Sequence, residues 1–148
     1  MKTLVIVPAY NEEANISGVI TDLRENFPEG DILIVNDGSK DKTELIAKGL
    51  SVNVLSLPYN LGIGGAMQAG YRYAKEYDYD IAIQFDGDGQ HIASEIKKLI
   101  AILRDKSVDV VVGSRFLDEK DYKLTFFRKM GISFFFLSLI HNTWHEGH

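Results

Sequence analysis

Short runs of aliphatic and β-branched residues alternate with longer amphipathic segments over most of the chain, and this alternation constrains the fold more than any other feature. The first, second and fifth runs are apolar at nearly every position, which is typical of strands buried on both faces of a parallel sheet. The five runs are residues 4–7, 31–35, 52–57, 80–85 and 108–112. The sequence therefore predicts five strands, most of them parallel.

The segments between these runs have the spacing of amphipathic helices. Apolar residues recur at helical intervals over 16–27, with Asn11 as the expected N-cap and Glu12 and Glu13 in the first turn. Strands and helices joined by such short connections form βαβ units with right-handed crossovers. We therefore expect an α/β fold, with an open, doubly wound, mostly parallel sheet.

The alternation stops after Phe116, and we divide the chain into a domain of residues 1–123 and an apolar helical segment with its tail, 124–148. The phenylalanine-rich stretch 124–140 is apolar nearly all round, so it either folds back as core or meets a membrane surface or a second copy of the chain. No stretch reaches the roughly 20 apolar residues that span a bilayer. We expect a cytoplasmic homo-oligomer in peripheral contact with the inner face of the membrane.

Charge and cysteine content exclude two classes of function. The chain has 16 basic and 21 acidic residues and a net charge of −5, which argues against a nucleic-acid partner because nucleic-acid binding needs a basic surface. It has no cysteine, so disulfides, thiolate metal sites and cysteine nucleophiles are excluded.

Polar and glycine-rich stretches follow the carboxyl ends of all five predicted strands. Ligands of open α/β sheets bind beyond these ends, so the five stretches are expected to form one site. They are residues 8–13, 36–39, 59–62, 86–91 and 113–115.

The strongest of these signals is Asp86-Gly87-Asp88. Two carboxylates one residue apart can face one cation, and hard oxygen ligands suit Mg²⁺ or Mn²⁺. Gln90 can add a neutral oxygen. Such a cation would bridge a diphosphate and neutralise charge on the leaving group. The alternative is a solvated turn, since Asp and Gly are common turn residues.

Two other strand ends offer ligand contacts. Asp37 can accept hydrogen bonds from a nucleobase or a ribose, and its alternative role is to cap a helix or a turn, because Gly38 and Ser39 follow it. Gly62 opens a glycine-rich segment that lacks the third glycine of the dinucleotide fingerprint, because Met67 stands there. We interpret this segment as a helix N-terminus that meets a phosphate or sugar, with close helix–sheet packing as the alternative.

Arg115 follows the fifth run, and Arg128 lies in the next segment. Either side chain can hold phosphate oxygens, and a surface salt bridge is the alternative for both.

The chain resembles family 2 glycosyltransferases of the GT-A fold, in particular the branch that transfers sugars to polyprenyl phosphates. The resemblance covers most of residues 3–116, with the motifs in the family's order and spacing. The matching stretches are VIVPAYNEE (5–13), ILIVNDGSKDKT (32–43), NLGIGGAMQAGYRYA (60–74), IQFDGDGQH (83–91) and VVGSRF (111–116).

The resemblance implies transfer of a sugar from a UDP- or GDP-sugar to a polyprenyl phosphate, with inversion and with Mn²⁺ or Mg²⁺ as cofactor, in cell-envelope polysaccharide synthesis. It assigns Asp88 and Arg115 to catalysis. It assigns the metal to Asp86, Asp88 and Gln90. The implied nucleotide-sugar contacts are Pro8, Tyr10, Glu12, Asp37, Asp86 and Arg128, to which we add Gly62.

Members of this branch continue well past the point where the present sequence stops, so we expect a C-terminally truncated chain whose acceptor contacts lie in the missing part. Two other functions stay open. A nucleotidyltransferase usually carries a glycine-rich loop with Arg or Lys where this chain has residues 8–11, PAYN. The second function that stays open is that of a non-catalytic module that binds a nucleotide-sugar.

Overall fold

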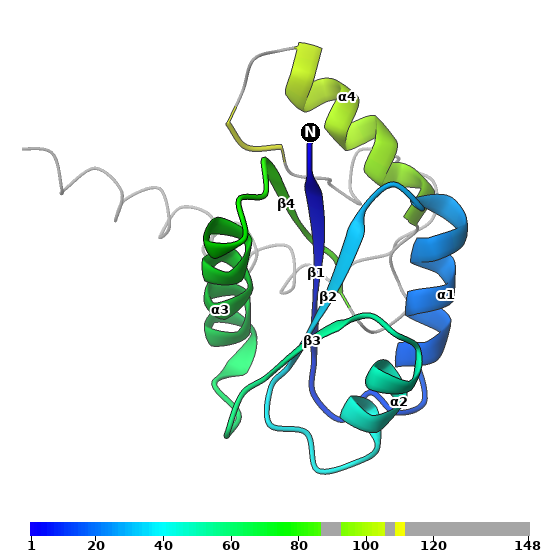
Figure 1. Cartoon of the computed structure of the whole chain (residues 1–148), viewed down its shortest axis with the longest axis vertical. Coiled ribbons are helices and arrows are strands. Elements are labelled where there is room, and N and C mark those ends of the chain that lie inside the picture. The colour runs from blue at the N-terminus through cyan, green and yellow to red at the C-terminus, as the bar shows by residue number, and fades with distance from the viewer. Residues whose placement is uncertain (87–92, 106–108, 112–148) are drawn as a thin grey trace, which may run out of the picture. The chain divides into compact units, whose positions relative to one another are not determined.

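The computed structural model describes residues 1–86, 93–105 and 109–111 of the 148-residue chain. They form a parallel sheet of four strands in the order β3-β2-β1-β4 with helices on both faces (Figure 1). The strands are β1 (Thr3–Ala9), β2 (Asp31–Asn36), β3 (Asn53–Ser56) and β4 (Ile81–Gln84). The helices are α1 (Ile16–Asn26), α2 (Thr43–Gly49), α3 (Gly62–Glu76), the short 3-10 helix η1 (Ala93–Glu95) and α4 (Ile96–Asp105).

Strand β1 lies at the centre of the sheet. It pairs with β2 from Leu4 opposite Asp31 onwards, and with β4 on its other side. Its side chains alternate between the two faces, so that Val5 and Val7 are buried on one side and Leu4 and Ile6 on the other. Burial on both faces explains why this run is apolar at every position.

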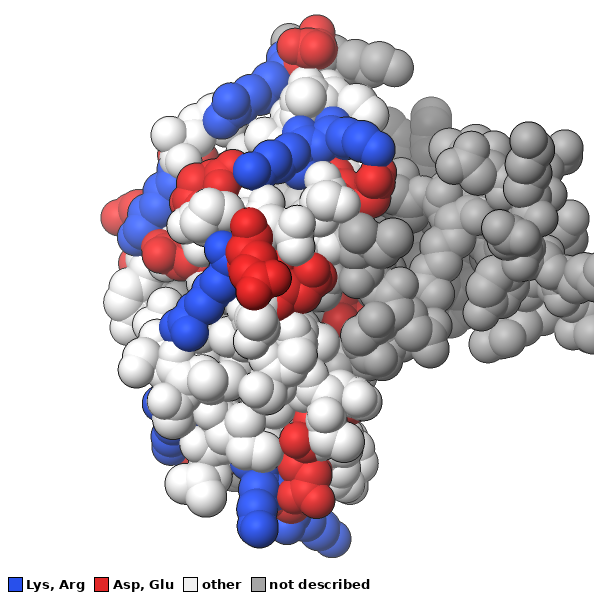
Figure 2. All heavy atoms as spheres, turned by 90° about the vertical axis from the view of Figure 1, so that its right-hand side faces the viewer, with Lys and Arg blue, Asp and Glu red and all other residues white. Residues whose placement is uncertain are grey.

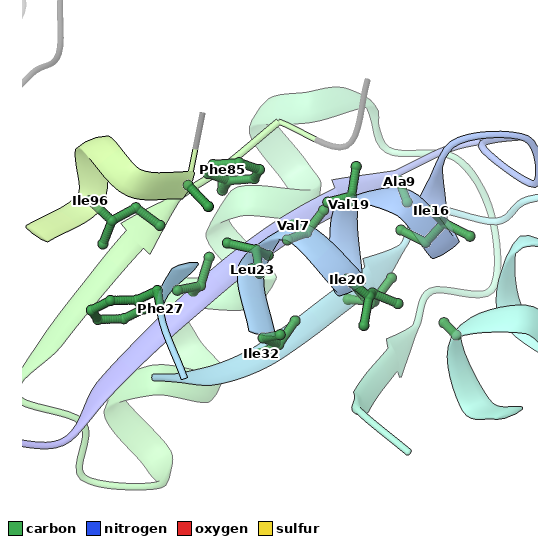
Figure 3. Close-up of a cluster of buried hydrophobic side chains, with 14 residues drawn as sticks. Val7, Ala9, Ile16, Val19, Ile20, Leu23, Phe27, Ile32, Phe85 and Ile96 are labelled. Carbon is green, nitrogen blue, oxygen red and sulfur yellow. The ribbon is translucent and has the colours of Figure 1, made fainter. Parts of the chain in front are cut away.

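The helices cover the two faces of the sheet separately, with α3 on one face and α1, α2 and α4 on the other (Figure 1). Figure 3 shows the larger core, in which Ile20 and Leu23 of α1 lie among side chains of β1 and β2. Phe27, Phe85 and Ile96 gather at one end of this cluster (Figure 3). The predicted α/β fold with a doubly wound parallel sheet is confirmed.

Helix α3 lies close to the sheet at Gly70. A Cβ built on this residue would lie 2.5 Å from Cγ2 of Ile6 and 3.4 Å from Cγ2 of Val35. Close helix–sheet packing, which the sequence offered as an alternative for the glycines near Gly62, therefore occurs at Gly70, because a larger residue would push α3 off the sheet. A Cβ at Gly64 would meet nothing within 4 Å.

The predicted start of the first helix is wrong. Helix α1 begins at Ile16 with Asn15 as its N-cap, and no acidic residue lies in its first turn. Asn11 has a φ of 55°, a conformation that asparagine tolerates, and its side chain bonds the next loop instead of a helix end. The carbonyl of Glu12 closes a turn with the N–H groups of Asn15 and Ile16. Residues 10–15 are thus a loop at the carboxyl end of β1.

The predicted fifth strand is wrong over residues 109–111, which have no regular secondary structure. Val110 is 74% exposed. An apolar run becomes a strand only where its backbone finds a ladder partner, and in the described sheet no further strand pairs with the edge strands β3 and β4. Residues 108 and 112, and the predicted boundary at 123, lie outside the described residues.

The surface over α1, α2 and α4 carries basic and acidic side chains next to one another (Figure 2). Lys48 pairs with Glu44, and Lys98 pairs with Glu95.

Within the described residues, no helix has both the length and the apolar character needed to cross a membrane.

Candidate functional site

A pocket of about 370 Å³ lies at the carboxyl edge of the sheet, the lower edge in Figure 1. The ends of β1, β2 and β4 and the start of α3 all contribute to it. Its lining residues are Pro8, Ala9, Tyr10, Glu12, Asp37, Asn60, Gly62, Ile63, Ala66 and Asp86. The structure thus brings together Pro8, Tyr10, Glu12, Asp37, Gly62 and Asp86, which were predicted to share one site.

The remaining predicted site residues, Asp88, Gln90, Arg115 and Arg128, lie outside the described residues. The predicted metal ligands are therefore represented by Asp86 alone. Among the residues that the structure describes, no three His, Cys, Asp or Glu side chains are grouped so that they could hold a metal ion.

Asp37 follows β2 and is only 3% exposed. Its Oδ1 accepts a hydrogen bond of 2.7 Å from the backbone N–H of Leu61, just before α3. Its own N–H donates to the carbonyl of Ala9 at 2.9 Å. A carboxylate can accept about four hydrogen bonds, so Asp37 can support α3 and still accept hydrogen bonds from a ligand in the pocket.

The turn after β2 is stabilised by Asn36, a residue that the sequence analysis did not single out. Asn36 is buried, and its Oδ1 accepts from the N–H of Ser39 at 3.2 Å while its Nδ2 donates to Glu44 at 3.2 Å. The Gly38 N–H donates to the Asn36 carbonyl at 3.0 Å. The turn-capping role considered for Asp37 therefore belongs to Asn36, whereas Asp37 bonds Leu61, the N-cap residue of α3. An Asn at a strand end, two residues before a glycine, is the sequence signal for it.

Gly38 allows two loops to touch. It has a φ of +67°, and a Cβ at this position would lie 2.7 Å from the carbonyl carbon of Tyr59 and 2.8 Å from the backbone nitrogen of Asn60. The loop after β2 therefore packs directly against the backbone of the loop that leads into α3, and no side chain fits between them.

Helix α3 starts at the pocket. Gly62 has a φ of +76°, and its N–H donates to Oδ1 of Asn60 at 2.9 Å. Because the N–H groups of Leu61 and Gly62 are bonded to Asp37 and Asn60, they are occupied within the chain. Gly62 and Ile63 line the pocket, which leaves the start of α3 next to any ligand there.

Tyr10 and Glu12 reach the pocket from the loop after β1. Tyr10 is 43% exposed. The Glu12 carboxylate accepts from Nδ2 of Asn15 at 2.8 Å, and the Glu12 N–H donates to Oγ1 of Thr43 at 2.8 Å. Hydrogen bonds to both the backbone and the side chain of Glu12 therefore fix the conformation of this pocket wall.

The loops after β1 and β2 are joined by reciprocal hydrogen bonds. The Asn11 N–H donates to Oγ of Ser39 at 3.0 Å, and the Lys40 N–H donates to Oδ1 of Asn11 at 2.9 Å. Two residues after Asn11, the Glu13 N–H donates to Oδ2 of Asp41 at 3.0 Å. These bonds hold a loop without secondary structure in one conformation.

The environment of Asp41 favours its charged form. Burial raises the pKa of this carboxyl, but hydrogen bonds from the Thr43 side chain, the Thr43 backbone and the Glu13 backbone together lower the pKa below its ordinary value. An ionised Asp41 can accept all of these bonds at neutral pH, which keeps the two loops joined.

Asp86 ends the extended segment of β4. The N–H of Phe85 donates to the carbonyl of Ile6 at 2.9 Å and continues the pairing with β1 past the strand end. Nε2 of Gln84 donates to Oδ1 of Asp86 at 3.2 Å. This places a carboxylate, a hard oxygen donor of the kind that Mg²⁺ and Mn²⁺ prefer, in the pocket lining.

The parallel doubly wound sheet and the position of its pocket define an α/β domain of the class that binds ligands at the carboxyl edge of its strands. Residues 4–146 match the sequence profile described as glycosyl transferase family 2, and the chain belongs to this family. The family expected from the sequence motifs is confirmed.

Two curated relatives are named for sugar transfer to a polyprenyl phosphate. The chain is 38% identical over 136 residues to UDP-N-acetylglucosamine–dolichyl-phosphate N-acetylglucosaminyltransferase of Methanococcus voltae, covering 80% of this chain and 54% of the relative. It is 37% identical over 120 residues to undecaprenyl-phosphate mannosyltransferase of Micrococcus luteus, covering 78% of this chain and 49% of the relative. The chain spans about half the length of these relatives.

A solved structure with the same fold is glucosyl-3-phosphoglycerate synthase of Mycobacterium tuberculosis, in complex with Mn²⁺, UDP and glucosyl-3-phosphoglycerate. It matches this chain with a TM-score of 0.57 and 26% identity, over 69% of this chain and 39% of that one. The likeness places the present fold among the GT-A glycosyltransferases.

Proposed function

We propose that this domain binds a nucleoside diphosphate sugar in the pocket and transfers the sugar to a polyprenyl phosphate. The observation that carries the proposal is the convergence of Glu12, Asp37 and Asp86 from three strand ends on one pocket. Its volume of about 370 Å³ lies in the usual range for small-molecule sites. The names of the two curated relatives support the choice of acceptor.

The donor's nucleoside end lies at Asp37 in this proposal. Asp37 is buried, lines the pocket and has acceptor capacity beyond its bond to Leu61, which suits a base N–H or a ribose hydroxyl. Pro8, Tyr10 and Glu12 form the wall beside it, and Gly62 faces the ligand from the start of α3.

Asp86, together with Asp88 and Gln90, would hold the Mn²⁺ or Mg²⁺ ion. The Asp86 carboxylate is a donor that fits either cation, and the Mn²⁺ and UDP in the mycobacterial enzyme support a metal-bound diphosphate. The ion would supply charge neutralisation for the departing diphosphate. Asp88, Arg115 and Arg128 belong to the same proposal, with Asp88 and Arg115 assisting departure and Arg128 holding phosphate oxygens.

A lipid phosphate acceptor brings its own anionic oxygen. The reaction therefore requires in-line attack at the anomeric carbon, with inversion, and no strong general base. We further propose that the apolar residues 124–140 bring the domain to the cytoplasmic face of the membrane and join copies of the chain. Sedimentation with and without anionic vesicles tests this part: a monomer that ignores vesicles contradicts it.

Product analysis tests the proposed reaction. The chain is incubated with UDP- and GDP-sugars, Mn²⁺ and a polyprenyl phosphate, and the released nucleotide is identified. Release of UDP or GDP that depends on the acceptor supports the proposal. In a parallel incubation with UTP or GTP and a sugar 1-phosphate, release of pyrophosphate would make the protein a nucleotidyltransferase. Tight nucleotide binding without turnover in either incubation would make it a binding module.

A further inference from the structure

Thr43 lies outside the pocket lining, yet its hydroxyl is bonded to the pocket wall. It is the first residue of α2, and it is 0% exposed. Its Oγ1 accepts the backbone N–H of Glu12 at 2.8 Å and donates its proton to Oδ1 of Asp41. The contact joins positions 31 residues apart in the sequence.

The direction of these bonds matters. A hydroxyl has one proton and two lone pairs. Here the hydroxyl uses its proton in a hydrogen bond to the Asp41 carboxylate. A lone pair is thereby left for the Glu12 N–H, and a charge-assisted bond on one side strengthens the acceptor on the other. Asp41 meanwhile accepts the next N–H of the loop, that of Glu13, at 3.0 Å.

The Glu12 N–H has no strand or helix partner. Residues 10–15 belong to neither kind of element, so the backbone of this pocket wall depends on side chains from the loop after β2. A part-buried N–H that loses its acceptor has to find water or move. Loss of the Thr43 hydroxyl would therefore shift Glu12 and Tyr10, which face the ligand.

We infer that Thr43 is a positioning residue of the pocket: its hydroxyl, oriented by Asp41, fixes the Glu12 backbone and so the wall that meets the nucleotide. The nucleotide part of this inference rests on the proposed function. Packing around Thr43 is separable from hydrogen bonding, because valine has nearly the same shape without the hydroxyl, and serine keeps the hydroxyl without the methyl group.

The test compares Thr43→Val with Thr43→Ser. We expect Thr43→Val to weaken binding of UDP or GDP, measured by calorimetry with Mn²⁺, by roughly tenfold. Thr43→Ser should restore most of the affinity. The matched control is Thr21→Val, because Thr21 is an exposed residue of α1 whose hydroxyl bonds the carbonyl of Ser17 within the same helix, and this variant should bind like the wild type.

A second readout does not need a nucleotide. The backbone amide of Glu12, followed by NMR hydrogen exchange in the free protein, should lose protection in Thr43→Val and regain it in Thr43→Ser. If no nucleotide binds the wild type, the proposed function fails, and the amide still decides whether Thr43 holds Glu12. Unchanged affinity and unchanged Glu12 protection in Thr43→Val would overturn the inference, as would equal losses in the valine and serine variants.

Asp41→Asn provides an independent approach should Thr43→Val fold poorly. Asp41 accepts from Thr43 with Oδ1 and from the Glu13 N–H with Oδ2. An amide replaces one of these two oxygens with an NH2 group, which donates and cannot accept, so one of the two bonds is lost. Nucleotide affinity and amide protection at Glu12 or Glu13 should fall in this variant. Retention of both would contradict the role given to the Asp41–Thr43 pair.

Discussion

Oδ1 of Asp37 accepts a hydrogen bond of 2.7 Å from the backbone N–H of Leu61, so a buried carboxylate at the end of β2 holds the residue that leads into α3. On its other side the same loop bonds the loop after β1 through Ser39 and Asp41, and Thr43 at the start of α2 adds the bond to Glu12. The loop after β2 therefore supports both neighbouring walls of the pocket, which explains how three segments distant in the sequence keep one geometry.

Asp37 is predicted to have two separable roles. Asp37→Asn keeps an oxygen for the Leu61 N–H, so the free energy of unfolding should change little, whereas nucleotide binding should weaken because the charge is lost. Asp37→Ala leaves that N–H without its acceptor and should lower the free energy of unfolding by about 1–3 kcal/mol. Chemical denaturation and calorimetry on both variants check this. Wild-type nucleotide affinity in Asp37→Asn would assign the residue to structure alone.

Gly38 and Gly18 should respond oppositely to alanine. Gly38→Ala meets both an unfavourable φ of +67° and the backbone of Tyr59, so we expect a loss of at least about 1–2 kcal/mol in the free energy of unfolding. Gly18 is an exposed residue of α1 with nothing within 4 Å of its Cβ position. Gly18→Ala should raise stability by about 0.5–1 kcal/mol. Denaturant unfolding of both variants tests the pair, and a tolerated Gly38→Ala would contradict the close backbone contact.

The strands of the sheet could be predicted because the signal for each one lies in its own run of residues. Val5 and Val7, and Leu33 and Ile34, lie on strands buried on both faces, so their apolar runs identify the strands without any knowledge of partners. The run around Val110 has the same composition but no ladder in the described residues. Apolar composition alone does not make a strand.

The site was predictable at its strand ends and not in the links between them. Asp37 and Asp86 follow buried strands, and strand ends converge in any parallel sheet. The bond from the Glu12 N–H to the Thr43 hydroxyl depends on how two segments pack against each other in the tertiary structure. A threonine hydroxyl can bond several different backbone groups, so the sequence alone does not identify its partner. Asn11, which has a positive φ, likewise bonds Lys40, a residue 29 positions away in the sequence.

Tyr79 is predicted to stabilise the edge of the sheet opposite the pocket. Its hydroxyl donates to Oδ2 of Asp31 at 2.8 Å, and Nζ of Lys2 lies 4.0 Å from its ring centroid. Tyr79→Phe keeps the ring and should cost about 0.5–1.5 kcal/mol. Tyr79→Leu also removes the cation–π contact and should cost more. Equal stability of the phenylalanine and leucine variants would show that the Lys2 contact contributes nothing measurable.

The same tyrosine gives a pH dependence with a defined sign. Burial and the hydrogen bond to Asp31 raise the pKa of Tyr79 above its ordinary value of 10.0. The unfolded chain then releases this proton first, so the stability contributed by the protonated hydroxyl is complete below the ordinary pKa and is lost as the pH rises above it. Denaturation at increasing alkaline pH should show a steeper loss in the wild type than in Tyr79→Phe. Parallel losses in the two proteins would contradict this.

Asp86 is predicted to make nucleotide binding depend on a divalent cation. A diphosphate beside a negatively charged carboxylate is repelled, and a cation between them reverses the sign of the interaction. UDP or GDP should therefore bind much more tightly with Mn²⁺ or Mg²⁺ than in EDTA, and Asp86→Asn should remove most of that gain because a neutral amide is a weaker ligand for a hard cation. Asp105→Asn, at the end of α4 and outside the pocket lining, removes the same charge and should leave the gain intact. Calorimetric titration of the three proteins in both conditions decides the point. Affinity that EDTA does not alter, or an Asp86→Asn variant that keeps the full metal effect, would exclude a metal role for this carboxylate.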